Sequence, residues 1–192
     1  MKVRFDLGDD VELRALEPED AEAVFVVIDA NREHLRRWFP WVDPTISPAP
    51  TREFIERSRA SETDVEAIGI WVDGEYAGNI GMRVDAMHNH GELGYWLAKS
   101  FEGRGLVTKG CQALIDHGLH ELGLHRIEIK AAPDNVRSRA VAERLGFTQE
   151  AQLREAGRSA GGYHDLIVYG LLENEWRPDL TRAVKRTEQP DA

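Results

Sequence analysis

The sequence predicts a single domain of the α/β class, in its α+β variety, built on one mixed sheet flanked by helices. Within residues 66–85, an Asp-Gly pair joins two apolar runs, which is typical of an antiparallel hairpin. The order strand, helix, strand over residues 92–131 requires a parallel pair. Two more strand-like runs follow in residues 148–172. Both kinds of pairing therefore occur in one sheet, and 192 residues suit one domain, expected over residues 1–176.

Local signals define the elements in order. Alternating apolar and polar residues indicate half-buried strands, and Pro18 among acidic neighbours suits the first turn of a helix. Thr51 is expected to cap a helix after a proline-rich loop over residues 43–50, and Gly123 and Gly146 suit helix ends. The expected strands are 10–16, two within 66–85, 92–98, 125–131, 148–156 and 162–172, and the expected helices are 17–30, 31–41, 52–62, 103–123 and 133–147. The polar tail, residues 177–192, is expected to be poorly ordered.

Composition narrows the class of protein. There are 24 Lys and Arg against 34 Asp and Glu, a net charge of −10. A nucleic-acid-binding protein normally carries a basic face, so we expect no nucleic-acid partner. The excess of acid is compatible with a cationic substrate, or simply with solubility. No apolar run reaches the roughly 18 residues of a membrane span, Cys111 is the one cysteine, and a cytoplasmic protein is expected.

The stretch "FEGRGLVTKG" places Gly103, Arg104 and Gly105 directly before a helix. Backbone N–H groups at a helix N-terminus have no helical partners and attract anions, so the glycines suit a phosphate cradle as well as a simple tight turn. The phosphate-loop pattern of NTPases does not occur here. The dinucleotide fingerprint also fails, because Thr108 stands in place of its third glycine.

Three motifs together resemble the GNAT acyltransferases. They are "GELGYWLAKSFEGRGLVTKG", "NVRSRAVAERLGF" and "GYHDLIVYGLL". More narrowly, the chain is similar to the Rim-type branch, which acetylates the N-termini of ribosomal proteins, and the similarity covers residues 11–176. The resemblance implies a sheet split between its fourth and fifth strands, with acetyl-CoA held in the gap.

The resemblance implies a cofactor site. The GNAT pyrophosphate loop matches residues 102–107, although Glu102 and Val107 depart from the family pattern. Backbone amides would hold the pyrophosphate, and the backbone of Leu97 would pair with the pantetheine arm. Asn135 matches a residue that contacts this arm, although it also suits a helix cap. The expected cofactor-binding residues are Leu97, Gly103, Arg104, Gly105, Leu106, Val107, Thr108, Asn135 and Ser138.

Amine acetylation needs a group that accepts a proton from the amine, and it benefits from a donor to the leaving thiolate. Many GNAT enzymes use a tyrosine as this donor, but Ala142 occupies its position here. Ser138 is the candidate donor by resemblance to Rim-type relatives, or a small residue that makes room for the cofactor. Glu92 is the first candidate base, although an ion pair would also account for it.

Other candidates for the base are Glu155, the two histidines His88 and His90, and a chain of water molecules. Trp38, Trp41, Glu155 and Asp165 are expected to bind the acceptor amine, although each tryptophan also suits the core.

No Cys pair or carboxylate completes a zinc set around His117 and His120, so no metal is expected. Three functions remain open: acetylation of a protein N-terminus, acetylation of a small amine such as a polyamine, aminoglycoside or amino-acid-like compound, and a CoA-binding module without turnover. A homodimer is expected by resemblance alone.

Overall fold

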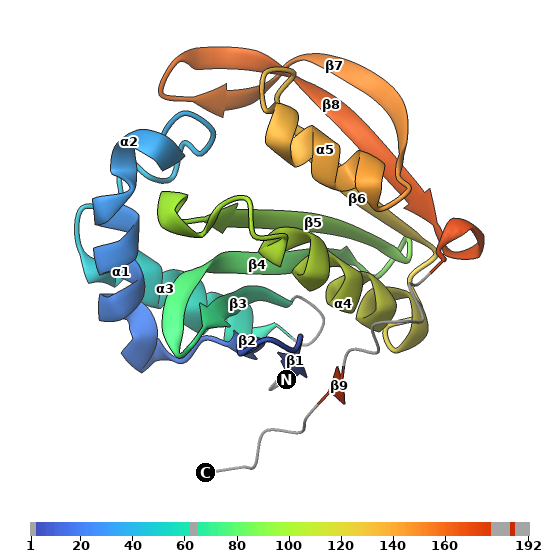
Figure 1. Ribbon diagram of the computed structural model, residues 1–192. Helices are drawn as coiled ribbons and strands as arrows, with labels where there is room; N and C mark the ends of the chain where they lie inside the picture. The colour runs from blue at the N-terminus through green and yellow to red at the C-terminus, as the bar shows by residue number, and fades with distance from the viewer. Residues whose placement is uncertain (1–2, 62–64, 178–184, 187–192) are drawn as a thin grey trace.

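A computed structural model describes residues 3–61, 65–177 and 185–186. The described strands form one sheet with helices on both faces (Figure 1). The strands are β1 (Arg4–Asp6), β2 (Val11–Ala15), β3 (Val65–Val72), β4 (Glu75–Asp85), β5 (His90–Leu97), β6 (Arg126–Ala131), β7 (Thr148–Ser159), β8 (Gly162–Leu172) and β9 (Lys185–Arg186). The helices are η1 (Pro18–Asp20), α1 (Ala21–Ala30), α2 (Arg32–Leu35), α3 (Pro48–Ala60), η2 (Lys99–Phe101), α4 (Leu106–His120), α5 (Val136–Arg144) and η3 (Glu173–Glu175).

The sheet runs in the order β7-β8-β6-β5-β4-β3-β2-β1-β9. Among the described strands, β5 and β6 form the single parallel pair, joined through α4, and every other neighbouring pair is antiparallel. This arrangement confirms the prediction of a mixed, mostly antiparallel sheet. The predicted hairpin forms β3 and β4, and both of its turn residues, Asp73 (φ 51°) and Gly74 (φ 78°), adopt the left-handed conformation of a tight hairpin turn.

The parallel pair is short. β5 and β6 are in register only from His90 opposite Arg126 to Leu93 opposite Ile129. Beyond these residues, β6 pairs with β8 and β5 continues beside β4 to Leu97. The described sheet therefore splits between the fourth and fifth of the predicted strands, and Figure 1 shows β5 and β6 diverging.

Some element boundaries differ from the predictions. α3 begins at Pro48, with Ser47 as its N-cap, rather than after Thr51. Prolines in the first turn are compatible with a helix because the N–H groups there need no helical partner. The short strands β1 and β9 were not predicted, since three and two residues show no periodicity. Within the tail, β9 pairs with β1, and residues 178–184 and 187–192 lie outside the described part of the chain.

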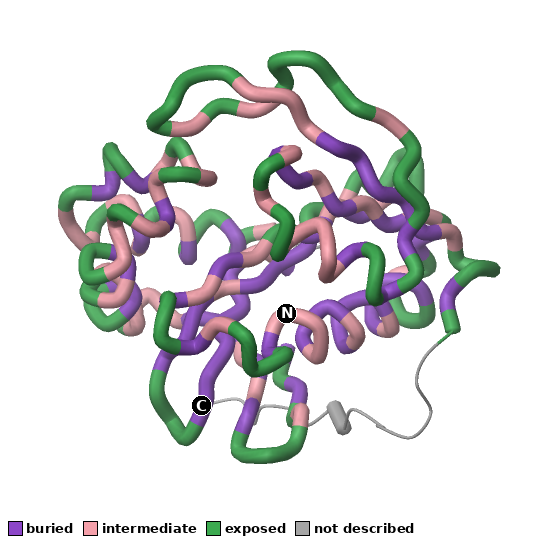
Figure 2. Tube along the Cα trace, turned by 45° about the horizontal axis from the view of Figure 1, so that its top comes forward, coloured by how far each residue is buried: buried purple, intermediate pink, exposed green. Residues whose placement is uncertain are grey.

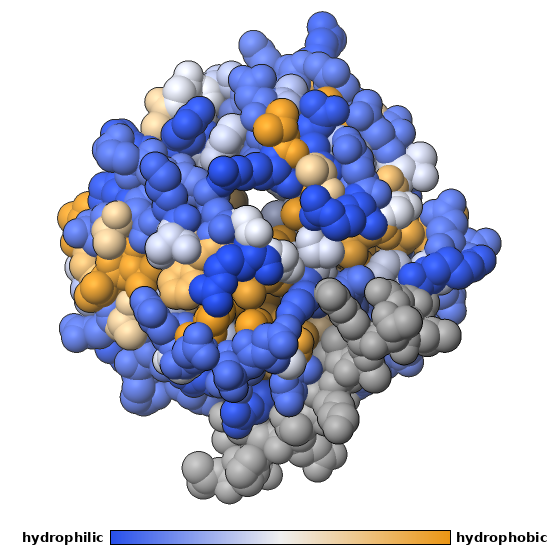
Figure 3. Space-filling view, in the orientation of Figure 1, coloured by the Kyte–Doolittle hydropathy of each residue, from blue (hydrophilic) through white to orange (hydrophobic). Residues whose placement is uncertain are grey.

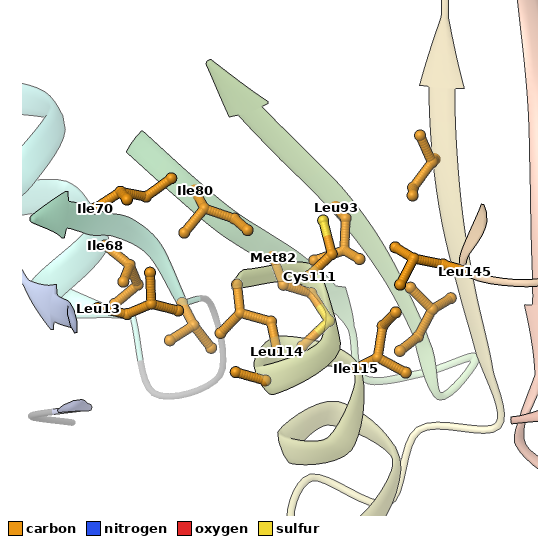
Figure 4. Close-up of a cluster of buried hydrophobic side chains, with 14 of the residues drawn as sticks. Leu13, Ile68, Ile70, Ile80, Met82, Leu93, Cys111, Leu114, Ile115 and Leu145 are labelled. Atoms are coloured by element: carbon orange, nitrogen blue, oxygen red, sulfur yellow. The ribbon is translucent and has the colours of Figure 1, made fainter. Parts of the chain in front are cut away.

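Two hydrophobic cores pack on the two faces of the sheet. On one face, α4 places Leu114 and Ile115 against β-strand residues such as Met82 and Leu93 (Figure 4). Cys111 lies in the same core, fully buried, and burial raises the pKa of its thiol above the ordinary value. On the other face, α1 and α3 cover a smaller core that is rich in aromatic residues. None of the described helices is long and apolar enough to cross a membrane.

β7 is mostly exposed, in contrast to the buried central strands, whereas β8 is buried over residues 167–171 and exposed at its start (Figure 2). The β7–β8 hairpin arches over the split, and its tip meets the segment after α2, where the backbone N–H of Ala160 donates to the carbonyl oxygen of Arg36 at 3.2 Å (Figure 1). Trp176, which follows η3, attaches the chain to α4: its indole Nε1–H donates to Asp116 Oδ1 at 2.6 Å.

The α4 core predicts a large loss of stability for Leu114→Ala, because Leu114 is fully buried. We expect the free energy of unfolding to fall by about 2–5 kcal/mol, measured by urea denaturation. Leu153→Ala is the matched control, since Leu153 is 43% exposed on β7, and its loss should stay below about 1 kcal/mol. Equal losses in the two variants would contradict the packing described here.

Candidate active site

The glycine loop between β5 and α4 has the geometry of an anion cradle. Gly103 (φ 77°) and Gly105 (φ 75°) are both left-handed, and Gly105 is the N-cap of α4. A Cβ atom added at either glycine would meet no other atom within 4 Å, so the space in front of the backbone is open. Helical bonding begins with the N–H of Lys109, which donates to the carbonyl oxygen of Gly105 at 3.0 Å. The N–H groups of Leu106, Val107 and Thr108 precede this bond and fit the pyrophosphate of acetyl-CoA.

Side chains of the loop fasten it to the rest of the domain. Leu106 is buried in the α4 core and Val107 packs against it. The hydroxyl of Thr108 accepts a hydrogen bond from Arg144 on α5 at 3.1 Å. The guanidinium of Arg104 lies 5.5 Å from the centre of the Phe101 ring. Of the predicted loop residues, the two glycines thus border open space, and the side chains of Leu106, Val107 and Thr108 contact the rest of the domain.

Glu102, which departs from the family pattern, joins three elements. Its carboxylate forms an ion pair with Arg137 on α5, and its other oxygen lies 3.2 Å from His34 Nε2 on α2. Burial lowers the pKa of His34, and Lys99, Arg137 and Arg37 lower it further, so the imidazole is neutral at pH 7. Glu102 therefore braces the loop on both sides of the split.

The inner edge of β5 is the second part of the cofactor site. From Gly94 to Leu97, β5 bonds to β4 on one side and has no partner strand among the described residues on the other. Its unpaired N–H and C=O groups on the β6 side are available to an extended ligand, which can add to the sheet as a strand does. This edge begins where the split begins and ends just before the glycine loop. It has the form that an extended arm such as pantetheine needs, and Leu97 lies at its end.

Ser138 lies at the start of α5, across the split from β5. Its Oγ is 3.0 Å from the phenolic oxygen of Tyr95, and its backbone N–H donates to Asn135 Oδ1 at 3.2 Å. Asn135 thus caps α5, the alternative reading of this residue. Burial raises the pKa of Tyr95 above its ordinary value, so the phenol stays protonated at neutral pH. Sequence reasoning missed Tyr95, although strand alternation from Leu93 places it on the α5 side of β5.

A cavity of about 620 Å³ lies on the opposite face of β5, under α1 and α3. Trp41 lines it and belongs to a row of aromatic contacts that continues through Trp96 (ring centres 6.1 Å apart) to Tyr76 (5.9 Å). Figure 3 shows a hollow near the centre of one face of the molecule, below the β7–β8 hairpin. The cavity contacts Gly94 and Tyr95, so it reaches β5 at the residues where the split begins.

The floor of the cavity consists of three cross-strand pairs of β4 and β5. Side chains two residues apart lie on one face of a strand, about 6.8 Å apart along it. The middle pair has no side chains, but only Gly94 faces open space, because the backbone of Glu66 fills the space in front of Gly81. The floor is therefore hollowed at Gly94, between a charged pair and a pair that contains an aromatic ring. The pairs are Arg83 with Glu92, Gly81 with Gly94, and Asn79 with Trp96.

The charges of the cavity are largely paired. Glu92 Oε2 lies 2.8 Å from Lys130 Nζ, so the ion-pair reading of Glu92 holds, although Glu92 also lines the cavity. Glu66 Oε1 lies 3.1 Å from Arg83 Nη2, and Arg57 adds a further positive charge to the wall. Burial alone would lower the pKa of Lys130, but its bonds to Glu92 and Glu128 raise it, so the ammonium is charged at neutral pH.

Other predicted residues lie elsewhere. Trp38 and Asp165 line a separate cavity of about 300 Å³ beside the tip of the β7–β8 hairpin. Glu155 lines neither cavity. It sits at an irregular point of β7 (φ 50°), where its N–H donates to Asp165 Oδ1 at 2.9 Å. His88 is exposed and pairs with Asp85, and His90 faces Glu128 at 3.5 Å.

Within the described part of the chain, no three His, Cys, Asp or Glu side chains gather as metal ligands.

Comparisons with known proteins identify the family. Residues 10–148 match the family model of the "Acetyltransferase (GNAT) domain". The chain is 38% identical over 175 residues to "Putative ribosomal N-acetyltransferase YdaF" of Bacillus subtilis, covering 88% of this chain and 95% of that one. It is 28% identical over 169 residues to the ribosomal-protein-serine acetyltransferase of Escherichia coli, covering 86% and 94%.

Among solved structures, the chain is similar to RimL, a ribosomal L7/L12 alpha-N-protein acetyltransferase in complex with coenzyme A. The TM-score is 0.81 at 27% identity, covering 88% of this chain and 97% of that one. The family match, the glycine cradle and the split sheet lead to one conclusion: the chain belongs to the GNAT family of acetyl-CoA-dependent N-acetyltransferases.

Proposed function

We propose that this enzyme acetylates the α-amine at the N-terminus of a protein, with a ribosomal protein as the first candidate. The names of the relatives support this acceptor class. The observation in the chain itself that carries the proposal is the charge balance of the cavity under α1 and α3. Its two lining acids, Glu66 and Glu92, are each paired with a cation, and two arginines share its wall.

The paired charges of the cavity favour a peptide N-terminus over a polyamine as the acceptor. A polyamine carries several positive charges, and its desolvation in a cavity is offset only by acids that are free to pair with it. A peptide end brings one amine that must lose its proton before it reacts, followed by a neutral backbone. The aromatic wall and the paired charges of this cavity suit the peptide end, in spite of the net charge of −10 for the whole chain.

Acetyl-CoA supplies a thioester, whose carbonyl carbon forms the new bond to the amine nitrogen as the bond to sulfur breaks. The chain supplies the proton transfers and the geometry. Gly94 leaves room for the amine beside the split, and Glu92, one row along the same face, accepts its proton directly or through water. On the other side of β5, the Ser138 hydroxyl, held by Tyr95, donates a hydrogen bond toward the leaving sulfur.

The glycine cradle predicts that Gly105→Glu abolishes binding of acetyl-CoA. The new carboxylate would fill the open space in front of the amides and repel the phosphates. Calorimetric titration should give a dissociation constant in the micromolar range for the native protein and no measurable binding for the variant. Gly123→Glu is the control, because Gly123 (φ 67°) is also left-handed and open but lies beyond the other end of α4. Loss of binding in both variants would point to strain rather than to the cradle.

The role of Glu92 predicts that Glu92→Gln lowers kcat by about 100-fold, since a positioned base contributes on that order. The dissociation constant of acetyl-CoA should stay the same. Glu128→Gln serves as the control, because Glu128 also pairs with Lys130, with Oε2 3.3 Å from Nζ, but does not line the cavity. Steady-state kinetics of peptide acetylation in the two variants distinguishes a role of Glu92 as the base from an effect through Lys130. Equal losses would assign the effect to Lys130, and an unchanged kcat in Glu92→Gln would assign the proton to water.

Ser138 and Tyr95 are expected to act as a unit. Ser138→Ala removes the hydroxyl, and Tyr95→Phe removes its partner while keeping the ring. Each should lower kcat by about tenfold, and the double variant should lose no more than Ser138→Ala alone, because the two changes break one interaction. Additive losses in single-turnover rates would show that the two hydroxyls work independently.

A further inference from the structure

Three buried polar atoms of the cavity under α1 and α3 lack hydrogen-bond partners among the described residues. They are the Tyr76 hydroxyl, Thr51 Oγ1 and Asn79 Oδ1. Tyr76 is 4% exposed and Thr51 is 6% exposed. Nearly all buried polar groups in proteins are satisfied by protein, water or ligand, so three such atoms in one cavity need an explanation.

The structure fixes what these atoms offer. The Asn79 side-chain amide donates from Nδ2 to the carbonyl oxygen of Glu66 at 2.9 Å, which leaves Oδ1 as an acceptor alone. Burial raises the pKa of Tyr76 well above its ordinary value, so its hydroxyl remains a donor at neutral pH. Thr45, by contrast, already donates its hydroxyl hydrogen to the carbonyl oxygen of Trp41 at 2.7 Å and has no further proton to give. The three atoms therefore present one obligate acceptor and two hydroxyls that donate or accept.

We infer that Thr51, Tyr76 and Asn79 form a polar subsite for the first side chain of the acceptor, and that this side chain carries a hydroxyl or a carboxamide. Both groups donate to Asn79 and accept from a hydroxyl at the same time. An aliphatic side chain would leave all three atoms unpaired, and a carboxylate has no proton to give to Asn79. The inference rests on the proposed function, since it takes the acceptor to be a peptide end.

The spacing of the floor agrees with this subsite. The amine is placed over Gly94, and the next row along the same face holds Asn79 and Trp96, about 6.8 Å away. The γ-atom of a residue lies roughly 3 Å from its own α-nitrogen, and a hydrogen bond adds about 3 Å. The two lengths together nearly equal one row. The first side chain of the acceptor thus reaches the row of Asn79 while its amine stays at the split.

The floor of the cavity also limits the size of the first residue of the acceptor. A Cβ atom added to Gly94 would meet nothing within 4 Å, so the fold does not need a glycine there. The absence of a side chain leaves that space to the acceptor. Trp96 and Trp41 bound the cavity beside it, which suits a small first residue held by hydrogen bonds better than a large apolar one.

The test uses two pairs of peptides that differ only in residue one and are matched in shape: threonine against valine, and asparagine against leucine. For the native enzyme we expect kcat/KM for the polar member of each pair to exceed that of the apolar member by about tenfold or more. Tyr76→Phe and Thr51→Val each remove one hydroxyl without changing the packing volume. Each should bring the ratio toward one, with the dissociation constant of acetyl-CoA and the urea midpoint as checks on cofactor binding and folding.

The outcomes distinguish failure of the polar subsite from failure of the proposed function. Ratios near one in the native enzyme, with all four peptides acetylated, would overturn the subsite and leave the proposed function standing, since the three atoms would then be satisfied by water. A high native ratio that neither variant lowers would also overturn it, because other residues would then make the choice. If spermidine is acetylated and no peptide is, the proposed function fails, and the subsite fails with it.

Discussion

The pairing between β5 and β6 that stops after four residues is the constraint on which the site depends. Strands that run side by side in a closed sheet would satisfy every backbone group, and no ligand could enter between them. Here the pairing ends at Leu93 and Ile129, and the next residues of β5 keep half of their backbone groups free. Unpaired backbone groups inside a sheet are costly unless something bonds to them. The split is thus a binding edge built into the middle of the fold.

Two further features act through this edge. The glycine cradle lies at its end, because β5 leads through η2 directly into the loop before α4. Tyr95 crosses the split from β5 to Ser138 and joins the strand to α5 at the level of the expected thioester. Adjacent residues of β5 face opposite ways, so Tyr95 serves the cofactor side while Gly94 and Trp96 shape the cavity on the other face. In the proposed mechanism, one strand thereby contributes to both halves of the reaction.

Several elements of the fold and the glycine loop were predictable from the sequence, because their signals lie within short segments. The turn at Asp73 and Gly74, the helix over residues 106–120 and the glycine loop each carry their signal within a few residues. The Rim-type resemblance supplied the split, which no local pattern shows. The start of α3 was missed because prolines read as a loop, although the first turn of a helix accepts them. The cavity floor was missed as well, since the pairing of Gly81 with Gly94 and the unpaired atoms of Tyr76 and Asn79 depend on contacts between distant segments.

The buried position of Cys111 has a practical consequence. It is the one cysteine of the chain, it lies at 0% exposure in the α4 core, and burial keeps its thiol protonated. A thiol-reactive dye, which attacks only accessible thiolate, finds nothing to label on the folded enzyme. The thiol of coenzyme A released in each turnover is then the sole source of colour. The folded enzyme therefore adds no colour of its own to such an assay, and a slow rise in colour without substrate would report unfolding instead of catalysis.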